Sequence, residues 1–198
     1  MYTRFFKRLL DIIGSLLALP FVALEILFIA PIIWLTDKGP VFYIATRAGK
    51  NYKPFKMFKF RSMYVNSPDL KSPDGSTYSS DNDPRVTPIG HFLRKTSLDE
   101  FPQFLNVFLG NMSFVGPRPK LYNKDVILEN LTEVHRKSYS VKPGITGYTQ
   151  AYFRNSVTQE DKFKWDAYYA DNLTFLMDIK VIFKTVYTVI TRKNVNNA

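Results

Sequence analysis

Apolar residues dominate the first part of the chain, where residues 12–35 contain one charged residue, Glu25. A run of this length and hydropathy is typical of a membrane segment. As a straight helix it would measure about 36 Å, which exceeds a hydrocarbon core of about 30 Å. Pro20 and Pro31 interrupt the run, and an internal proline removes a backbone donor and clashes with the carbonyl four residues earlier. The pattern therefore predicts a helix that kinks or breaks near Ala18 and Leu19, just before Pro20.

Basic residues stand on both sides of this segment. Arg4, Lys7 and Arg8 precede it, and residues 38–68 contain seven Lys or Arg and no acidic residue. Because basic flanks favour the cytoplasmic side of a membrane, both flanks are expected on that side. We therefore predict a re-entrant helix–break–helix with its basic flank over residues 1–38, and a second domain on the cytosolic face over residues 39–198. A kinked spanning helix and a buried helical hairpin are the alternatives.

Beyond this segment the apolar spacing changes from strand-like to helical. Residues 40–64 alternate apolar and basic positions, which predicts short strands or a compact basic module. The apolar residues of 104–109 and 176–190 recur at helical spacing and predict amphipathic helices. The polar stretch 66–83, rich in Pro, Ser and Asp, predicts a mobile surface loop. The fold class expected is α+β, a mostly helical interfacial domain with short strands.

Composition narrows the classes of function. The 198 residues are 45% apolar, so the chain should fold into one domain of ordinary size, alone or with an appendage. The absence of cysteine excludes disulfides, thiolate metal sites and a cysteine nucleophile. Twenty-seven Lys and Arg against 17 Asp and Glu indicate an anionic partner, which can be nucleic acid, a phosphate-bearing substrate or an acidic membrane.

One acidic pair, Asp99 and Glu100, lies in a long basic stretch and has the composition of a phosphate-handling site. Across residues 84–124 these are the only acidic residues. If Arg94 and Arg118 converge on the pair, their guanidinium groups could hold phosphate oxygens. A carboxylate there could bind Mg²⁺ and attack phosphorus, provided that the cations offset the repulsion between two anions.

The alternative interpretation of the pair is structural. Ser97 and Glu100 have the spacing of a capping box, and Asp99 could itself cap a helix that tolerates Pro102 in its first turn. Acidic residues at a helix start are favoured by the helix dipole, and caps are far commoner than nucleophiles. Spacing alone therefore favours the cap.

A series of ordered motifs extends over nearly the whole chain. They are KRLLD (7–11), GPVF (39–42), KFRSM (59–63), DPRVT (83–87), SLDEFPQ (97–103), NV (106–107), MSFVGPRP (112–119) and KPGITG (142–147). In this order, and with the apolar segment, they resemble the bacterial sugar transferase family, the monotopic phosphoglycosyl transferases, in their minimal form. Two positions depart from the family pattern: Ala23–Leu24 replaces a helix-breaking Ser–Pro, and Phe153–Arg154 replaces Gly–Arg.

The resemblance implies an enzyme that moves a phosphosugar from a UDP-sugar to polyprenol phosphate, usually undecaprenyl phosphate, and releases UMP. It makes Asp99 the nucleophile that forms a covalent phosphosugar intermediate, with Glu100 as its partner and Mg²⁺ as the cofactor bound by the two carboxylates. The residues that it implies for substrate binding are basic: Lys59, Arg61, Arg85, Arg94, Arg118 and Arg154. It also implies the first membrane step of glycan synthesis, on the cytoplasmic face of the bacterial inner membrane, by a monotopic protein.

Two other functions remain as alternatives. A non-catalytic basic adaptor would bind anionic lipid, with the acidic pair as a helix cap, and its lipid binding would weaken with salt. A nucleic-acid-binding protein would use the aromatic and basic residues of 53–61, with a steep salt dependence. Neither explains the apolar segment and the ordered motifs together, so no nucleic-acid partner is expected. The sequence leaves the sugar, the glycan and homodimerisation open.

Overall fold

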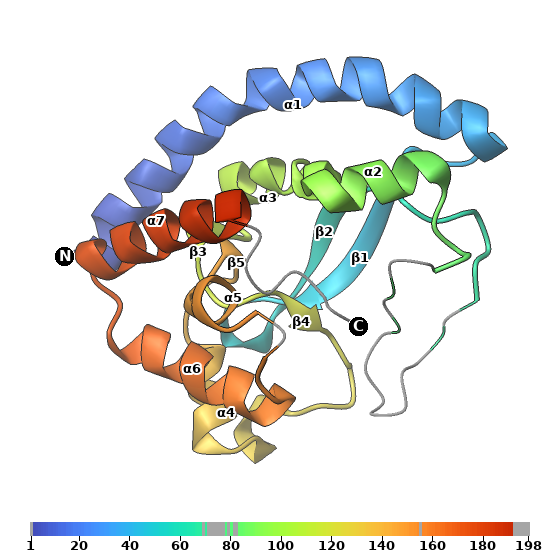
Figure 1. Ribbon diagram of the computed structural model, residues 1–198. Helices are drawn as coiled ribbons and strands as arrows, with labels where there is room; N and C mark the ends of the chain where they lie inside the picture. Colours follow the sequence, from blue (N-terminus) through green and yellow to red (C-terminus); the bar gives the residue numbers. More distant parts are fainter. Residues whose placement is uncertain are drawn as a thin grey trace.

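A long helix arches over one side of a body of short helices and strands (Figure 1). The computed structural model describes residues 2–68, 70, 78, 80, 83–154 and 156–191, without the side chain of Arg4. The long helix, α1, spans Lys7–Asp37 and follows a π-helical turn, η1, at Tyr2–Phe6. The rest of the described chain forms short strands and further helices. The mixed helix and strand class predicted from the sequence is therefore confirmed.

Helix α1 is continuous for 31 residues, with Pro20 and Pro31 inside it. The break predicted before Pro20 is therefore not found, and the helix curves instead (Figure 1). A proline removes one backbone hydrogen bond, and bending can relieve its clash with the preceding turn while the other helical bonds remain. The helix ends at Lys38, whose left-handed backbone directs its N–H to the carbonyl of Trp34.

The N-terminal end of α1 is tied to the body by charged side chains. Arg8 donates two hydrogen bonds to the carbonyls of Val107 and Phe108. Oδ1 of Asp11 accepts hydrogen bonds from Oγ of Ser113 and the backbone N–H of Phe114, both at 3.0 Å. These contacts give the motif at residues 7–11 a structural purpose, because they join the membrane-type helix to the segments that flank the acidic pair.

The C-terminal half of α1 packs on the same body through apolar side chains. Ile29 and Ile33 form a buried cluster with Phe60 and Leu93. Both ends of the helix therefore contact one body, and the chain between them is a single curved helix and not a hairpin.

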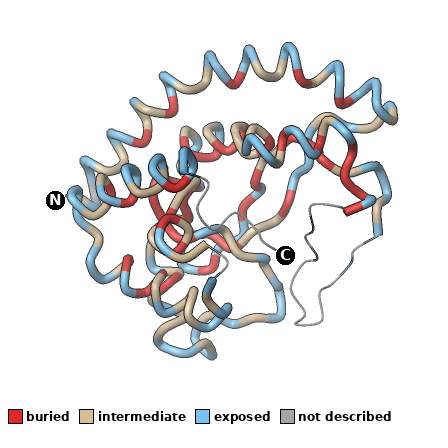
Figure 2. Tube along the Cα trace, in the orientation of Figure 1, coloured by how far each residue is buried: buried red, intermediate tan, exposed pale blue. Residues whose placement is uncertain are grey.

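The outer face of α1 is exposed and apolar (Figure 2). Among the described residues, α1 is the one helix that is long and apolar enough to cross a membrane. Only 11% of its most apolar 18-residue stretch is buried against the protein. An exposed apolar surface of this size marks contact with a membrane or a partner. Its exposed members include Leu9, Ile13, Leu16, Leu17, Phe21, Leu24, Leu27, Phe28, Ile32 and Leu35.

Two small sheets position the motif-containing loops around the acidic pair. Strand β1, Phe42–Ala48, pairs antiparallel with β2, Pro54–Phe60, after a 3-10 turn, η2, at Lys50–Tyr52. The other edge of β1 pairs antiparallel with β4, Lys120–Leu121. The second sheet consists of β3, Ser113–Val115, and β5, Gly144–Thr146, in parallel. The strands predicted within residues 40–64 are thus confirmed.

Short helices surround these sheets (Figure 1). They are α2 (Pro88–Thr96), η3 (Leu98–Glu100), α3 (Gln103–Leu109), η4 (Leu128–Asn130), α4 (Glu133–Ser138), α5 (Tyr148–Tyr152), α6 (Gln159–Asp171) and α7 (Phe175–Thr191). The helices predicted around 104–109 and 176–190 correspond to α3 and α7, so both are confirmed. Much of the loop predicted at 66–83 lies outside the described residues.

Candidate functional site

The acidic pair lies in a sharp turn between two helices. Ser97 ends α2 with a left-handed backbone, at a φ of 60°, and Asp99 and Glu100 follow in the 3-10 turn η3. The side chain of Ser97 forms no cap hydrogen bond, and α3 begins only after Pro102, again without a side-chain cap. The predicted capping box is therefore wrong. The pair precedes α3 in sequence, but its carboxylates do not cap that helix.

Glu100 binds two cations from different elements. Its Oε1 accepts hydrogen bonds from Nζ of Lys59, at 2.6 Å, and from Nη2 of Arg118, at 2.8 Å. Burial alone would raise the pKa of Glu100, but Arg118 and Lys59 outweigh it and lower the pKa to about 2. Glu100 is therefore ionised at neutral pH and fixes the position of both cations.

The carboxylate of Asp99 is also buried, but unlike that of Glu100 it accepts no hydrogen bond from a described residue. Asp99 is 9% exposed, and its Oδ2 lies 3.9 Å from Nζ of Lys59. Within the described part of the chain, no hydrogen bond reaches its carboxylate. Burial raises the pKa of Asp99, the charge of Lys59 offsets part of that rise, and the neighbouring Glu100 adds to it. The carboxylate of Glu100 is thus hydrogen-bonded to two cations, whereas the carboxylate of Asp99 is free to react.

Three of the predicted substrate-binding residues gather around the pair. Lys59, from β2, contacts both carboxylates. Arg118 reaches Glu100 from the loop after β3, and its side chain stays 55% exposed. Arg94, from α2, acts electrostatically on Asp99 while its Nε donates to Oγ of Ser62 at 2.9 Å. The structure therefore brings Lys59, Arg94 and Arg118 together, and their contact with substrate stays a prediction.

The loop that carries Arg118 is held by close backbone packing. A Cβ atom on Gly144 would lie 2.1 Å from the backbone nitrogen of Gly116, a distance that no side chain can adopt. This contact belongs to the parallel pairing of β3 with β5, and it explains why two glycine-containing motifs, at 112–119 and 142–147, accompany each other. Arg118 follows two residues after Gly116, so the packing sets its position.

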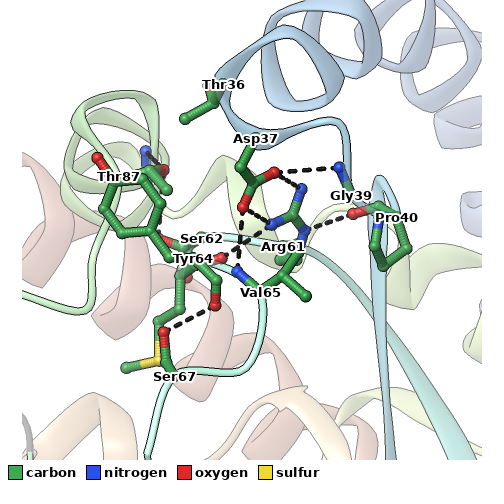
Figure 3. A network of polar contacts seen from close by, with 12 residues as sticks. Thr36, Asp37, Gly39, Pro40, Arg61, Ser62, Tyr64, Val65, Ser67 and Thr87 are labelled. Atoms are coloured by element: carbon green, nitrogen blue, oxygen red, sulfur yellow. Dashed lines mark hydrogen bonds and ion pairs between the residues drawn. The ribbon is translucent and has the colours of Figure 1, made fainter.

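Arg61 is placed differently from the other predicted substrate residues (Figure 3). Its two terminal nitrogens donate to the two carboxylate oxygens of Asp37, the last residue of α1, and its Nε donates to the carbonyl of Pro40. One of the terminal nitrogens also donates to the carbonyl of Met63. Arg61 is 8% exposed. These contacts anchor the end of α1, and substrate binding by Arg61 stays a prediction that they do not support.

Arg85 and Arg154 also lie away from the pair. Arg85 donates to the buried carboxylate of Asp83 and to the carbonyls of Pro68 and Tyr78, so its guanidinium holds a loop together. Arg154 lies two residues beyond the end of α5 and has a left-handed backbone conformation, at a φ of 48°. Among the described residues, no hydrogen bond or ion pair joins Arg154 to Asp99 or Glu100. Substrate contact by either arginine stays a prediction.

A cavity beside Glu100 includes Arg47, which the sequence did not single out. The residues that line it are Arg47, Met57, Lys59, Glu100, Gln103, Arg118 and Pro119. Arg47 was one of many basic residues in the stretch 38–68. The signal that could have found it is strand alternation, because the β1–β2 register puts Arg47, Met57 and Lys59 on one face of the sheet.

The residues of the site fit Mg²⁺ only with help from a substrate. No cluster of three or more His, Asp or Glu that could hold a metal is present among the residues described. Mg²⁺, however, is commonly bound by one or two carboxylates together with substrate phosphates and water. The free carboxylate of Asp99 and the adjacent Glu100 meet this requirement.

Comparisons with known proteins agree with the motif pattern. The sequence profile of the family described as bacterial sugar transferase matches residues 2–192. The exopolysaccharide production protein PSS of Rhizobium leguminosarum bv. phaseoli is 40% identical over 194 residues, which cover 94% of this chain and 96% of the relative.

Two relatives with named activities are longer proteins. The UDP-glucose:undecaprenyl-phosphate glucose-1-phosphate transferase of Klebsiella pneumoniae is 41% identical over 92% of this chain and 39% of its own length. The undecaprenyl-phosphate galactose phosphotransferase of Salmonella typhimurium is 36% identical over 96% of this chain and 41% of its own length. The chain thus spans about two fifths of these two relatives, whose names specify different sugars.

Proposed function

The chain belongs to the bacterial sugar transferase family, and on this premise we propose that it transfers a sugar phosphate from a UDP-sugar to undecaprenyl phosphate. The protein is an enzyme of the transferase class. The product would be a polyprenol diphosphosugar, with UMP as the second product, in the first membrane step of polysaccharide synthesis. The observation that carries the proposal is the asymmetric acidic pair, one carboxylate bound by cations and one free beside them.

The free carboxylate of Asp99 is the proposed nucleophile. One of its oxygens attacks the β-phosphorus of the UDP-sugar, and the bond from that phosphorus to the bridging oxygen breaks. The electron pair stays on the bridging oxygen, and UMP leaves. In the second step an oxygen of the lipid phosphate attacks the same phosphorus, and the carboxylate of Asp99 is released. Both steps exchange one phosphoryl bond for another, so no oxidant or other reactant is needed.

Cations make the approach of two anions feasible. Lys59 lies between the two carboxylates, and Arg94 and Arg118 act electrostatically on Asp99 from two sides. Their charges offset the repulsion between the carboxylate and the diphosphate. Glu100 keeps Lys59 and Arg118 in place. Mg²⁺, held by Asp99, Glu100 and phosphate oxygens, would neutralise further charge on the diphosphate when it is bound.

The arrangement of α1 supports a monotopic protein on the cytoplasmic face. Both ends of α1 pack on one body and its outer face is apolar, so the helix can enter one side of a bilayer while its flanks stay on that side. The acceptor phosphate lies at the level of the lipid headgroups, and the nucleotide sugar arrives from the cytosol. A shallow insertion would bring the site to the place where both substrates meet.

A donor-panel assay tests the function. The protein in lipid nanodiscs, with Mg²⁺ and undecaprenyl phosphate, is expected to release UMP from one or more of a set of UDP-sugars that includes UDP-glucose and UDP-galactose. Asp99→Asn should abolish release, and Asp125→Asn, at an exposed site, should not.

Mass spectrometry of the wild-type protein with donor alone should find a sugar phosphate on the peptide that contains Asp99. Full turnover by Asp99→Asn would reject the nucleophile. Salt-sensitive binding to anionic vesicles without UMP release from any donor would favour the adaptor.

A further inference from the structure

Arg47 forms no ion pair with any carboxylate that the structure describes. It projects from β1 into the cavity beside Glu100, and its Nε is buried without a hydrogen-bond partner in the described part of the chain. Glu100 is the carboxylate that lines the same cavity, and its Oε1 already accepts from Lys59 and Arg118. The described lining of the cavity therefore contains three cations, Arg47, Lys59 and Arg118, and one carboxylate, that of Glu100.

This arrangement is unfavourable without a ligand. Arg47 is half-buried, and a buried donor such as its Nε loses its hydration without compensation when it lacks a partner. Burial lowers the pKa of Arg47 and the charge of Arg118 lowers it further, whereas Tyr43 and Glu100 act in the opposite direction. An anion with several oxygens would satisfy the free Nε and relieve the repulsion. A phosphate group has this chemistry, and guanidinium groups bind it through parallel donors.

The cations are arranged in an order along the site. Tyr43, the register partner of Lys59, lies four residues before Arg47 on β1, and the described lining of the cavity that Arg47 enters includes Glu100 but neither Asp99 nor Arg94. Lys59 lies between, within 4 Å of both carboxylates. Arg47 is therefore at the end of the site that is remote from the nucleophile, where the phosphate that does not react with Asp99 would lie.

We propose that Arg47 and Arg118 form a shared phosphate site, which holds the α-phosphate of the UDP-sugar in the first step and the phosphate of undecaprenyl phosphate in the second. This inference rests on the proposed function. It adds Arg47 as a substrate-binding residue and states the order in which the two phosphates occupy its site.

The chemistry of a double displacement requires such sharing. Each attack on phosphorus is in line, so the group that leaves in the first step departs opposite the oxygen of Asp99. In the second step the bond to Asp99 breaks, so the entering oxygen must approach from that same opposite side. UMP and the lipid phosphate therefore occupy one position in turn. Both ligands would meet the same two cations, because Glu100 holds the exposed side chain of Arg118 and the sheet holds the backbone of Arg47 between β2 and β4.

Single-turnover kinetics test the kinetic role of the site. In Arg47→Gln, both the formation of the sugar-phosphate adduct and its resolution by undecaprenyl phosphate should slow by about 10- to 100-fold, the loss expected for a hydrogen bond to a charged group. Arg47→Lys should recover part of both rates. Arg136→Gln, which removes an exposed arginine on α4, is the matched control and should change neither. Unchanged rates in Arg47→Gln, or a slower first step alone, would overturn the shared site.

A binding experiment needs no turnover. In Asp99→Asn, which cannot form the adduct, UMP and undecaprenyl phosphate should each protect the protein against thermal unfolding and should compete with each other. Arg47→Gln in the same background should weaken both. Simultaneous binding would overturn the proposal. Absence of an adduct in wild-type protein with every donor would instead reject the proposed function, so the two failures are distinguishable.

Discussion

Removal of the guanidinium of Arg61 should destabilise the junction between α1 and the body of the protein and should not weaken substrate binding. In Arg61→Ala, the carboxylate of Asp37 loses both hydrogen bonds from this side chain, and the carbonyls of Pro40 and Met63 lose one each. Asp37 would keep only the backbone N–H groups of Gly39 and Val65 as donors. The perturbation thus isolates the structural role that the contacts indicate.

The magnitude follows from burial. Arg61 is 8% exposed and the side chain of Asp37 is 16% exposed. Loss of one partner from a buried ion pair costs about 3–5 kcal/mol, and the partial exposure of Asp37 favours the lower end, about 3 kcal/mol. For a chain of this size, 1 kcal/mol corresponds to about 2–4 °C, so the Tm should fall by about 6–12 °C. Arg61→Lys keeps the charge but not the paired donors, and it should recover only part of the loss.

The assay combines stability with kinetics. Thermal unfolding is followed by intrinsic fluorescence in lipid nanodiscs for Arg61→Ala, Asp37→Asn and the double variant. Because both residues act in one pair, the double variant should be less destabilised than the sum of the single variants. Arg61 lowers the pKa of Asp37, so the stability from this pair is present above the ordinary carboxyl pKa and is lost as the pH falls through the lowered one.

The result that would refute this reasoning is a large rise in KM for the UDP-sugar with an unchanged Tm. Arg61 would then contact substrate, as the motif at 59–63 first suggested. Additive losses in the double variant would equally reject the ion pair as the source of stability.

Two further predictions concern the acidic pair and the loop that positions Arg118. Because burial raises the pKa of Asp99, its ionised form destabilises the fold; Asp99→Asn should therefore have an unchanged or higher Tm at pH 7, and this advantage should vanish as the pH falls and the wild-type carboxyl becomes protonated. A lower Tm for Asp99→Asn at pH 7, measured by calorimetry, would contradict this sign. Gly144→Ala should lower the Tm by more than 10 °C or prevent folding, because its Cβ would collide with the backbone of Gly116; a near-normal Tm would show that β3 and β5 can separate without cost.

Local patterns were sufficient for the elements of secondary structure. Alternation in residues 40–64 predicted short strands, which are β1 and β2, and the apolar stripes predicted α3 and α7. At Pro20 the same local reasoning allowed a kink or a break, and the break that we favoured is not found. A proline specifies only that one hydrogen bond is lost and that the preceding turn is crowded. Whether the helix then breaks or bends depends on what holds its two ends, and here Arg8 and Ile33 hold them on one body.

The sequence by itself determined the apolar helix, the basic character and the acidic pair with its ordered motifs, because each is a property of neighbouring residues. Only the tertiary structure decided which cations face that pair. Arg61 pairs with Asp37 across 24 positions, whereas Lys59 pairs with Glu100 across 41. The sequence does not show which lysines and arginines face the acidic pair. The path of the chain places some of them beside a structural carboxylate and others, including Arg47, at the candidate site.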